Sequence, residues 1–413
     1  MRNIFKYLRQ YHLTEPIDVD RLIVSAFLQI NNLKLKYNTF LKGYLINKTT
    51  NEQEYLNLQE FVIVVKSEIN TFDFEKLIEL FEFVISPADR VVNGAVYTPS
   101  YIREYIVKNT LSFRTEIKDV FKVADIACGC GGFLFNAAIE LKRITKKTYA
   151  AIFREHIFGL DIQRYAITRT KLLLSLLALS SGEDEKIYIF NLETGDALDF
   201  KWGFGFDVIL GNPPYVCARK LDRETREKLK KMEVCKSGSS DLYIPFFQIA
   251  IENLASNGII GFITMNTFFK SLNGRDLRAF FQKKSLAFSI IDFGGEQIFR
   301  SKNTYTCICF IENREEDWIL YSSTESLNLY KKHNFNRINY NLLNWKKGWN
   351  LKNNKIIAQI ESQGIPFGEL YRTKHGIATL RNDVYIFKPI KEDDDYYYLQ
   401  NGSLYQIEKG VCR

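Results

Sequence analysis

The chain has 413 residues and carries 56 Lys and Arg against 48 Asp and Glu, a formal net charge of +8. That length is enough for two or three domains with a substantial core. The basic balance suits a polyanionic partner, although a solvated basic surface would give the same charge. The sequence shows neither a signal peptide nor a long apolar span, so we expect a cytoplasmic protein outside the membrane. Four His and seven Cys without a Cys-x-x-Cys pair predict no metal site and reduced thiols.

The N-terminal residues 1–90 show helical periodicity, as in residues 75–83, and predict a small helical domain that packs on the rest. Residues 60–66 lack the Glu-x-Lys spacing of a nuclease strand, so we expect no restriction activity within this chain. Pro87 and the turn at residues 92–94 mark the boundary before the next domain.

A strand–turn–helix unit is predicted from residue 122 onwards. An apolar strand runs into Gly129, Gly131 and Gly132, and a helix follows from Phe133 to about Arg143. This pattern is typical of the first βα unit of a doubly wound α/β fold, whose ligands bind beyond the carboxyl ends of the strands. Glycine lets the backbone of such a turn approach a ligand closely.

Two further segments lead to carboxylates at the same edge of the predicted sheet. The strand at residues 157–160 ends in Asp161, which we expect to accept hydrogen bonds from ribose hydroxyls. The segment at residues 187–190 leads to Asp196, placed to accept from an adenine amino group. The glycine turn lacks the Gly-x-Gly-x-x-Gly spacing that seats a pyrophosphate, so a nicotinamide dinucleotide is disfavoured. S-adenosylmethionine, which has adenosine and no phosphate, fits better.

The most informative stretch is residues 206–215, an apolar strand that ends in Asn212, Pro213, Pro214 and Tyr215. The two prolines fix φ and lack N–H groups, which leaves carbonyls free to accept. The Asn212 amide oxygen and the Pro213 carbonyl together can accept both protons of one amino group, with Tyr215 as a stacking plate. We therefore predict a site for a planar ring with an exocyclic amine; the alternative is an ordinary Pro-Pro turn with an exposed Tyr.

These motifs resemble, in content and order, those of the N6-adenine DNA methyltransferases of type II restriction–modification systems, of the IIG kind with the gamma motif order. The resemblance covers residues 90–315 and departs at Cys130, where the family usually has Ser. It rests on residues 125–133, Asp161, Asp196 and residues 212–215, and on the flanking segments 94–99, 237–246 and 258–267.

The resemblance implies a class I S-adenosylmethionine-dependent methyltransferase fold with a mostly parallel sheet. It assigns catalysis to Asn212, Pro213, Pro214 and Tyr215. It assigns cofactor binding to Tyr97, Thr98, Pro99, Asp125, Ala127, Cys128, Gly129, Gly131, Asp161, Asp196, Ala197, Asn212, Pro214 and Phe246. A base flipped out of the duplex would stack on Tyr215 and on Phe299, although an aromatic in the position of Phe299 is more often a core residue.

The implied reaction moves a methyl group from S-adenosylmethionine to the N6 amino group of an adenine in duplex DNA, in a restriction–modification or related defence system. The basic segment 218–231 is then either a phosphate contact or a solvated helix. A protein-glutamine or RNA guanine methyltransferase, an N4-cytosine methyltransferase and a non-catalytic DNA-binding subunit are the alternatives. Residues 97–99 and the basic segment favour DNA.

After residue 315 the composition becomes polar, and residues 316–360 are expected to connect two domains. Residues 376–387 resemble the opening strands of the family's C-terminal specificity domain. The expected organisation is therefore an N-terminal helical domain (1–90), a methyltransferase catalytic domain (91–315), a polar connecting region (316–360) and the start of the specificity domain (361–413). About fifty residues follow from Gly364 onwards, fewer than a typical domain needs. We therefore expect a longer C-terminal segment or a separate specificity subunit to complete recognition. The sequence leaves open the recognition sequence, a separate nuclease and the oligomeric state.

Overall fold

The computed structural model describes residues 1–11, 16–49, 51–84, 97–112, 121–236, 240–299, 304–363, 365, 367–371, 396–400 and 403–407. The chain divides into two compact units, Met1–Asn354 and Lys355–Arg413.

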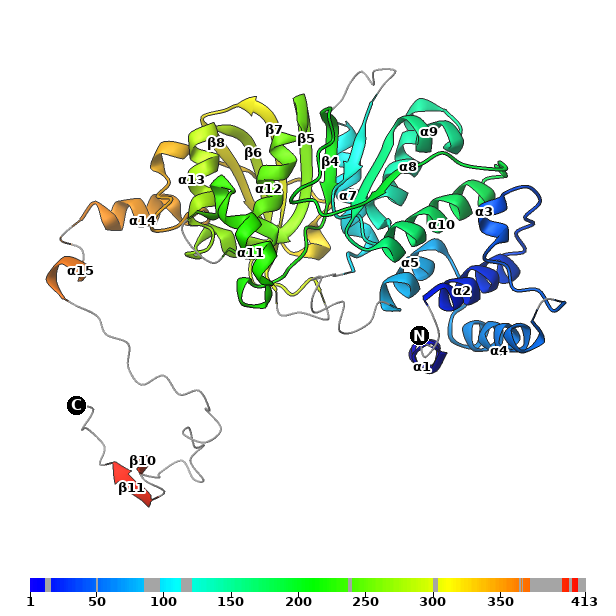
Figure 1. The fold of residues 1–413 in the computed structure, drawn as a ribbon. Coiled ribbons are helices and arrows are strands. Elements are labelled where there is room, and N and C mark those ends of the chain that lie inside the picture. Colours follow the sequence, from blue (N-terminus) through cyan, green and yellow to red (C-terminus); the bar gives the residue numbers. More distant parts are fainter. Residues whose placement is uncertain are drawn as a thin grey trace. The chain divides into compact units, whose positions relative to one another are not determined.

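A nine-stranded sheet forms the centre of the first unit, in the order β3-β2-β1-β4-β5-β7-β6-β8-β9 (Figure 1). Its strands are β1 Val123–Asp125, β2 Ile157–Asp161, β3 Asn191–Thr194, β4 Phe206–Gly211, β5 Leu254–Met265, β6 Leu286–Asp292, β7 Thr306–Glu315, β8 Trp318–Ser323 and β9 Asn336–Asn339. Strands β1 to β5 pair in parallel, whereas β7 runs antiparallel between β5 and β6. The chain order changes direction between the neighbours β1 and β4, the switch point at which ligands of such sheets bind.

Helices cover both faces of this sheet. They are α7 Ser100–Ser112, α8 Gly132–Thr145, α9 Tyr149–Glu155, α10 Arg164–Ser180, α11 Arg223–Lys230, α12 Tyr243–Glu252 and α13 Arg275–Lys284. Gly261 of β5 lies against Thr110 and Ile106 of α7, whereas the next residue, Phe262, contacts Phe247 of α12. Because successive strand residues face opposite sides, α7 and α12 lie on opposite faces. This is the predicted doubly wound α/β architecture.

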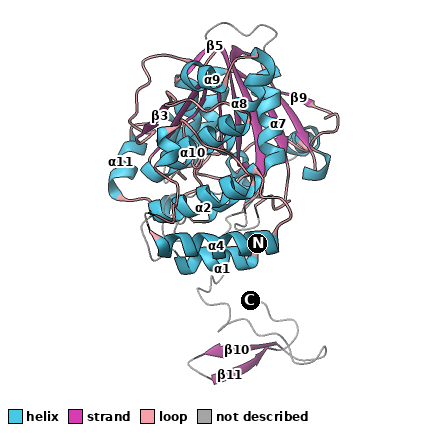
Figure 2. Cartoon of the chain, turned by 90° about the vertical axis from the view of Figure 1, so that its right-hand side faces the viewer, coloured by secondary structure: helices cyan, strands magenta, loops and turns pink. Residues whose placement is uncertain are grey.

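The N-terminal helical region predicted from the sequence is present and packs on α10 (Figure 2). It contains α1 Arg2–Tyr11, α2 Pro16–Ile30, α3 Thr39–Lys42, α4 Glu52–Glu68 and α5 Phe74–Phe83. Asn51 and Asp73 cap α4 and α5 by accepting from the backbone N–H groups three residues on. A buried ion pair joins the region to α10, since Arg169 Nε lies 2.8 Å from Asp20 Oδ1.

Two segments differ from the sequence-based expectation. The third strand begins at Asn191, because Ile187 and Ile189 are exposed while Tyr188 and Phe190 pack on Phe153 of α9.

Residues 316–360, expected to connect two domains, instead extend the sheet through β8 and β9. Ile319 and Tyr321 alternate inward along β8 and are buried, and Trp349 is fully buried. The polar composition that suggested a connection belongs to the exposed positions of these strands and turns.

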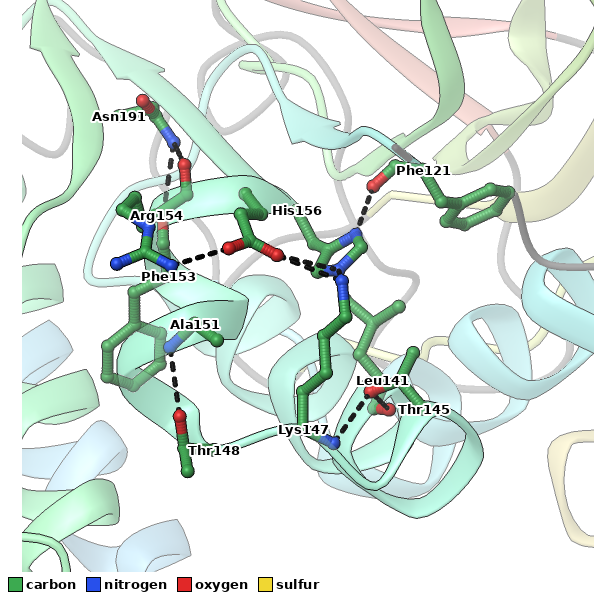
Figure 3. A network of polar contacts seen from close by, with 11 residues as sticks. Phe121, Leu141, Thr145, Lys147, Thr148, Ala151, Phe153, Arg154, His156 and Asn191 are labelled. Atoms are coloured by element: carbon green, nitrogen blue, oxygen red, sulfur yellow. Dashed lines mark hydrogen bonds and ion pairs between the residues drawn. The ribbon is translucent and has the colours of Figure 1, made fainter. Parts of the chain in front are cut away.

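At the amino end of β2, the buried His156 joins neighbouring strands (Figure 3). Its Nδ1 lies 2.7 Å from the Phe121 carbonyl, which can only accept, so Nδ1 carries the proton. Nε2 therefore accepts from Lys147 Nζ at 3.0 Å, and Lys147 also pairs with Glu155. Burial lowers the pKa of His156. The network secures the start of the sheet, at the opposite end from the predicted site.

Helix α14, Asn354–Glu361, begins at the last residue of the first unit. The second unit also contains α15 Phe367–Leu370 and an antiparallel hairpin of β10 Tyr396–Gln400 and β11 Ser403–Ile407. The specificity-like segment 376–387 and the predicted boundary at Pro87 and residues 92–94 lie outside the described residues. Among the helices described, none combines the length and the apolar character needed to cross a membrane.

Candidate active site

A cavity lies at the carboxyl ends of β1, β2, β3 and β4. It is lined by most of the residues predicted to bind cofactor, namely Tyr97, Thr98, Asp125, Ala127, Cys128, Gly129, Asp161, Asp196, Ala197, Asn212, Pro214 and Phe246. The other predicted site residues, Pro99, Gly131, Pro213, Tyr215 and Phe299, are not among the residues that line it. Segments more than a hundred residues apart in sequence therefore meet in one hollow.

The glycine turn between β1 and α8 shapes one wall of the cavity. Gly129 and Gly131 have φ of 53° and 85°, which side chains with a Cβ rarely adopt. A Cβ on Gly131 would lie 2.7 Å from Thr170, so Gly131 supports the turn from behind rather than facing the cavity. Cys130, the position at which the sequence departs from the family, has a fully buried side chain.

Asp161 and Asp125 place two carboxyl groups beside this turn. Asp161 accepts from the backbone N–H of Gly129 at 2.9 Å and of Gln163 at 2.8 Å. Burial raises the pKa of Asp161 to about 6 and that of Asp125 to about 8, although backbone N–H donors act in the opposite direction. A cationic ligand would favour the ionised forms of both groups, because an opposite charge nearby lowers a carboxyl pKa.

Asp196 lies at the rim, where part of the basic segment folds over the cavity. Residues 218–231 form a short 3₁₀ turn, Ala218–Lys220, and α11. Lys228 of α11 pairs with Asp196 at 2.7 Å and Asp199 at 2.6 Å, and also with Glu224. The helix thus contributes to the cavity wall, and one of its lysines is neutralised within the chain.

Asn212 follows β4 directly and lines the cavity. Its Nδ2 donates to the Thr98 hydroxyl at 3.0 Å. Gly211 precedes it with φ of 147°, and a Cβ there would lie 2.7 Å from Asp125 Oδ1. The close contact between the ends of β1 and β4 therefore requires glycine before Asn212.

Tyr215 and Phe299 differ from the expected arrangement. Tyr215 is buried, and its hydroxyl donates to the Ile263 carbonyl at 3.3 Å. Its ring meets that of Phe299 edge-on, with centroids 6.0 Å apart and planes at 61°. The two rings are neighbours, as the resemblance implied, but they contact each other instead of forming an open parallel slot.

Several lining residues were not predicted from the sequence. Ile78 and Glu82 come from α5 of the N-terminal region, and Glu82 Oε1 accepts from the Cys130 N–H at 3.3 Å. Ile162 follows Asp161 and is 57% exposed. An apolar residue directly after a strand-end acid could have indicated from the sequence that Ile162 lines the cavity. Nothing local marks Glu82. In the described part of the chain, no three His, Cys, Asp or Glu side chains cluster as a metal site would need.

A family model described as the Eco57I restriction-modification methylase matches residues 155–299. This part of the chain, about a third of its length, is therefore similar to the methylase of that family. The Type II restriction enzyme and methyltransferase RM.Eco57I of Escherichia coli is 25% identical over 501 residues, covering 100% of this chain and 50% of the relative. The Type II methyltransferase M.BstVI of Geobacillus stearothermophilus is 27% identical over 55% of this chain and 43% of the relative. The chain thus spans about half the length of these relatives or less.

Solved structures share the fold at low sequence identity. The type IIG restriction endonuclease BpuSI superposes with a TM-score of 0.60 at 13% identity, over 94% of this chain and 52% of that protein. A class I S-adenosylmethionine-dependent methyltransferase from Listeria monocytogenes gives 0.51 at 17% identity, over 79% and 93%. The DrdV–DNA complex gives 0.61 at 16% identity, over 81% and 40%. The first unit therefore has the class I S-adenosylmethionine-dependent methyltransferase fold.

Proposed function

We propose that this chain transfers a methyl group from S-adenosylmethionine to the N6 amino group of an adenine in duplex DNA, as the modification part of a restriction–modification system. One observation carries the proposal. A single cavity joins the glycine turn, Asp161 and Asp196 to Asn212 and Pro214. The proposed nucleoside-binding end of the cavity is thus continuous with its proposed amine-binding end.

The charge of the cavity favours this cofactor. Its lining includes Glu82, Asp125, Asp161, Asp196 and Asp222, against Arg103 and Lys220. Arg103 is itself paired with Glu75 at 2.5 Å. Lys228 pairs with Asp196, and burial raises the pKa values of Asp125 and Asp161, so the hollow is less negative than this count suggests. A sulfonium would favour the ionised forms of Asp125 and Asp161, whereas a pyrophosphate would not, and S-adenosylmethionine has a sulfonium and no phosphate. The residues present therefore fit the cofactor.

Each wall of the cavity has a role in this scheme. Asp161 accepts from the ribose hydroxyls and Asp196 from the adenine amino group of the cofactor, while Phe246 packs on its ring. When bound, S-adenosylmethionine supplies an electrophilic methyl group on a positively charged sulfur. Asn212 and the Pro213 carbonyl accept the two protons of the target amine, which favours a pyramidal nitrogen with an available lone pair. The activated amine attacks the methyl group without a strong base or a metal. Most of the rate acceleration then comes from holding the amine and the methyl group in the right orientation.

The target base must leave the duplex to reach this site. Tyr215 is the stacking partner that we infer, and its edge-on contact with Phe299 must open before a base lies between them. Basic residues contact phosphates without reading sequence, so we assign affinity to them and sequence choice to other elements.

The test is transfer of a tritiated methyl group to duplex DNA, with RNA and protein as competing acceptors and digestion of the DNA to nucleosides. We expect the label in N6-methyladenine. Asn212→Ala should abolish transfer and leave cofactor affinity within about threefold, whereas exposed Asn341→Ala should match the wild type. Label in N4-methylcytosine, RNA or protein, or an active Asn212→Ala variant, would contradict the proposal.

A further inference from the structure

A buried arginine connects the N-terminal helical region to the segment that faces Asn212. Arg103 of α7 is 2% exposed, and each of its guanidinium nitrogens has an acceptor. Nε donates to Asn136 Oδ1 at 2.9 Å, Nη1 to the Thr98 carbonyl, and Nη2 to Glu75 Oε2 at 2.5 Å. A planar guanidinium with all its nitrogens engaged holds its partners in a fixed geometry.

Glu75 of α5 fixes the same segment a second time. Its other carboxylate oxygen accepts from the Tyr97 hydroxyl, so one side chain holds both Tyr97 and, through Arg103, Thr98. Gly132 leaves room for this arrangement, because a Cβ at that position would lie 3.2 Å from Arg103 Cδ and Nε. Contacts with Glu75 of the N-terminal region therefore hold the segment before α7, which contains Tyr97 and Thr98, in place.

Thr98 passes this constraint to the catalytic turn. Its side chain is buried, and its hydroxyl accepts from Asn212 Nδ2 at 3.0 Å. The nitrogen and oxygen of an amide lie on opposite sides of Cγ, so a contact that holds Nδ2 turns Oδ1 away from Thr98. The terminal torsion of Asn is otherwise broad, and a reversed amide would present donors to the amine whose protons it has to accept.

We propose that Thr98 is a positioning residue that holds the Asn212 side chain in the orientation seen in this structure, and that Glu75 and Arg103 hold Thr98 in place for this task. The inference rests on the proposed function, since it concerns the acceptor role assigned to Asn212. It extends that function by making α5 of the N-terminal helical region a part of the catalytic support.

The first test compares Thr98→Val, which removes the hydroxyl at nearly constant volume, with Thr98→Ser, which keeps it. Single-turnover methyl transfer by Thr98→Val should be slower by about tenfold, and Thr98→Ser should stay within about threefold of the wild type. Cofactor dissociation constants, measured by calorimetry, are the control: because the lost contact is to Asn212, the loss of transfer rate in Thr98→Val should exceed any loss of cofactor affinity. An unchanged or faster Thr98→Val, or a loss fully explained by weaker cofactor binding, overturns the inference.

The second arm changes Glu75, which does not line the cavity. Glu75→Gln removes the charge that pairs with Arg103, and we expect slower transfer in the same direction as Thr98→Val. Glu79→Gln is the matched control, since Glu79 lies on the same helix and pairs only with Lys76 in the described structure. Equal rates for Glu75→Gln and Glu79→Gln would remove α5 from the proposal.

A spectroscopic readout separates this inference from the proposed function. In protein labelled with ¹⁵N-asparagine, the Asn212 side-chain signal is identified by its absence in Asn212→Asp. Thr98→Val should shift or broaden that signal, while Thr98→Ser should leave it in place. If the wild type binds cofactor and methylates nothing, the proposed function fails, and an unmoved Asn212 signal in Thr98→Val overturns the positioning itself.

Discussion

At the scale of single residues, burial sets the chemistry of the cavity. Asp161 accepts two backbone N–H groups, yet desolvation outweighs them and raises its pKa to about 6. A carboxyl group protonated below that pH has lost its charge and one acceptor oxygen. Under the proposed function, its ability to hold a ribose diol should therefore depend on pH within the physiological range.

We predict that S-adenosylmethionine affinity falls as the pH drops through about 6, by up to about tenfold per pH unit for a single proton. The sign follows because the free protein binds a proton at Asp161 that the cofactor complex must release. Asp161→Asn should bind more weakly at pH 8 and show a shallower profile near pH 6, because only Asp125 of the two carboxyl groups remains. Calorimetry between pH 5 and pH 8 makes the measurement, and an equally steep profile in Asp161→Asn would contradict the assignment.

At the scale of elements, contacts with other segments determine the conformation of the glycine turn and the position of α11. Gly131, the N-cap of α8, has a left-handed φ and lies against Thr170 of α10. Gly182, after α10, has nearly the same φ of 84°, but a Cβ added there would have no atom within 4 Å. Comparing Gly131 with Gly182 therefore separates two effects of an added Cβ on stability: the strain of a left-handed backbone and the steric clash with neighbouring atoms.

Gly182→Ala should reduce the free energy of unfolding by about 1–2 kcal/mol, the usual cost of a left-handed residue with a Cβ. Gly131→Ala should cost more, because the added Cβ also meets Thr170 at 2.7 Å. Urea denaturation of both variants provides the comparison. Equal losses would mean that the turn relaxes away from Thr170 without penalty.

The position of α11 depends on the ion pairs of Lys228 with Asp196, Asp199 and Glu224. Lys228→Met should leave these carboxylates facing one another and increase hydrogen–deuterium exchange across Arg223–Lys230. Lys230→Met is the control, because Lys230 pairs only with Glu227 in the described structure and is 69% exposed. Equal exchange in the two variants would show that α11 is held by its apolar contacts alone.

At the scale of the whole molecule, buried polar contacts join the N-terminal helical region to the helices that cover the sheet. Asp20 of α2 and Arg169 of α10 are both nearly inaccessible, and Arg169 also donates to the Phe81 carbonyl of α5. Burial raises the pKa of Asp20 against the opposing effect of Arg169. Such a pair adds little net stability, but loss of one partner leaves a buried charge uncompensated.

Asp20→Ala should therefore destabilise the protein by about 3–5 kcal/mol, and Asp20→Ala with Arg169→Met should recover much of the loss. The four Trp residues, at positions 202, 318, 345 and 349, all lie outside the N-terminal helical region. A shift of the urea midpoint seen by Trp fluorescence would show that the helical region and the sheet unfold together. An unshifted Trp midpoint, with a loss of helix at lower urea, would show that they unfold separately.

Much of this molecule was predictable from local patterns. Apolar runs marked β1, β2 and β4, glycines marked the turn before α8, and strand-end residues marked Asp161, Asp196 and Asn212. These features are local, because a strand, a turn and the residue that follows a strand are all encoded within about ten positions of the chain. The sheet's switch point then brings the marked residues to one edge.

Other features depended on tertiary structure. Glu82 and Arg103 line the cavity, and Glu75 contacts Arg103, through packing between distant segments, which leaves no local pattern. The burial of Tyr215, the pairing of Lys228 with Asp196 and the addition of β8 and β9 to the sheet have the same origin. The sequence by itself determined which backbone segments form strands, turns and strand-end acids, because these follow from backbone propensity and periodicity. Only the folded chain decided which side chains are desolvated, paired or held in one orientation, because those properties depend on neighbours that sequence distance does not specify.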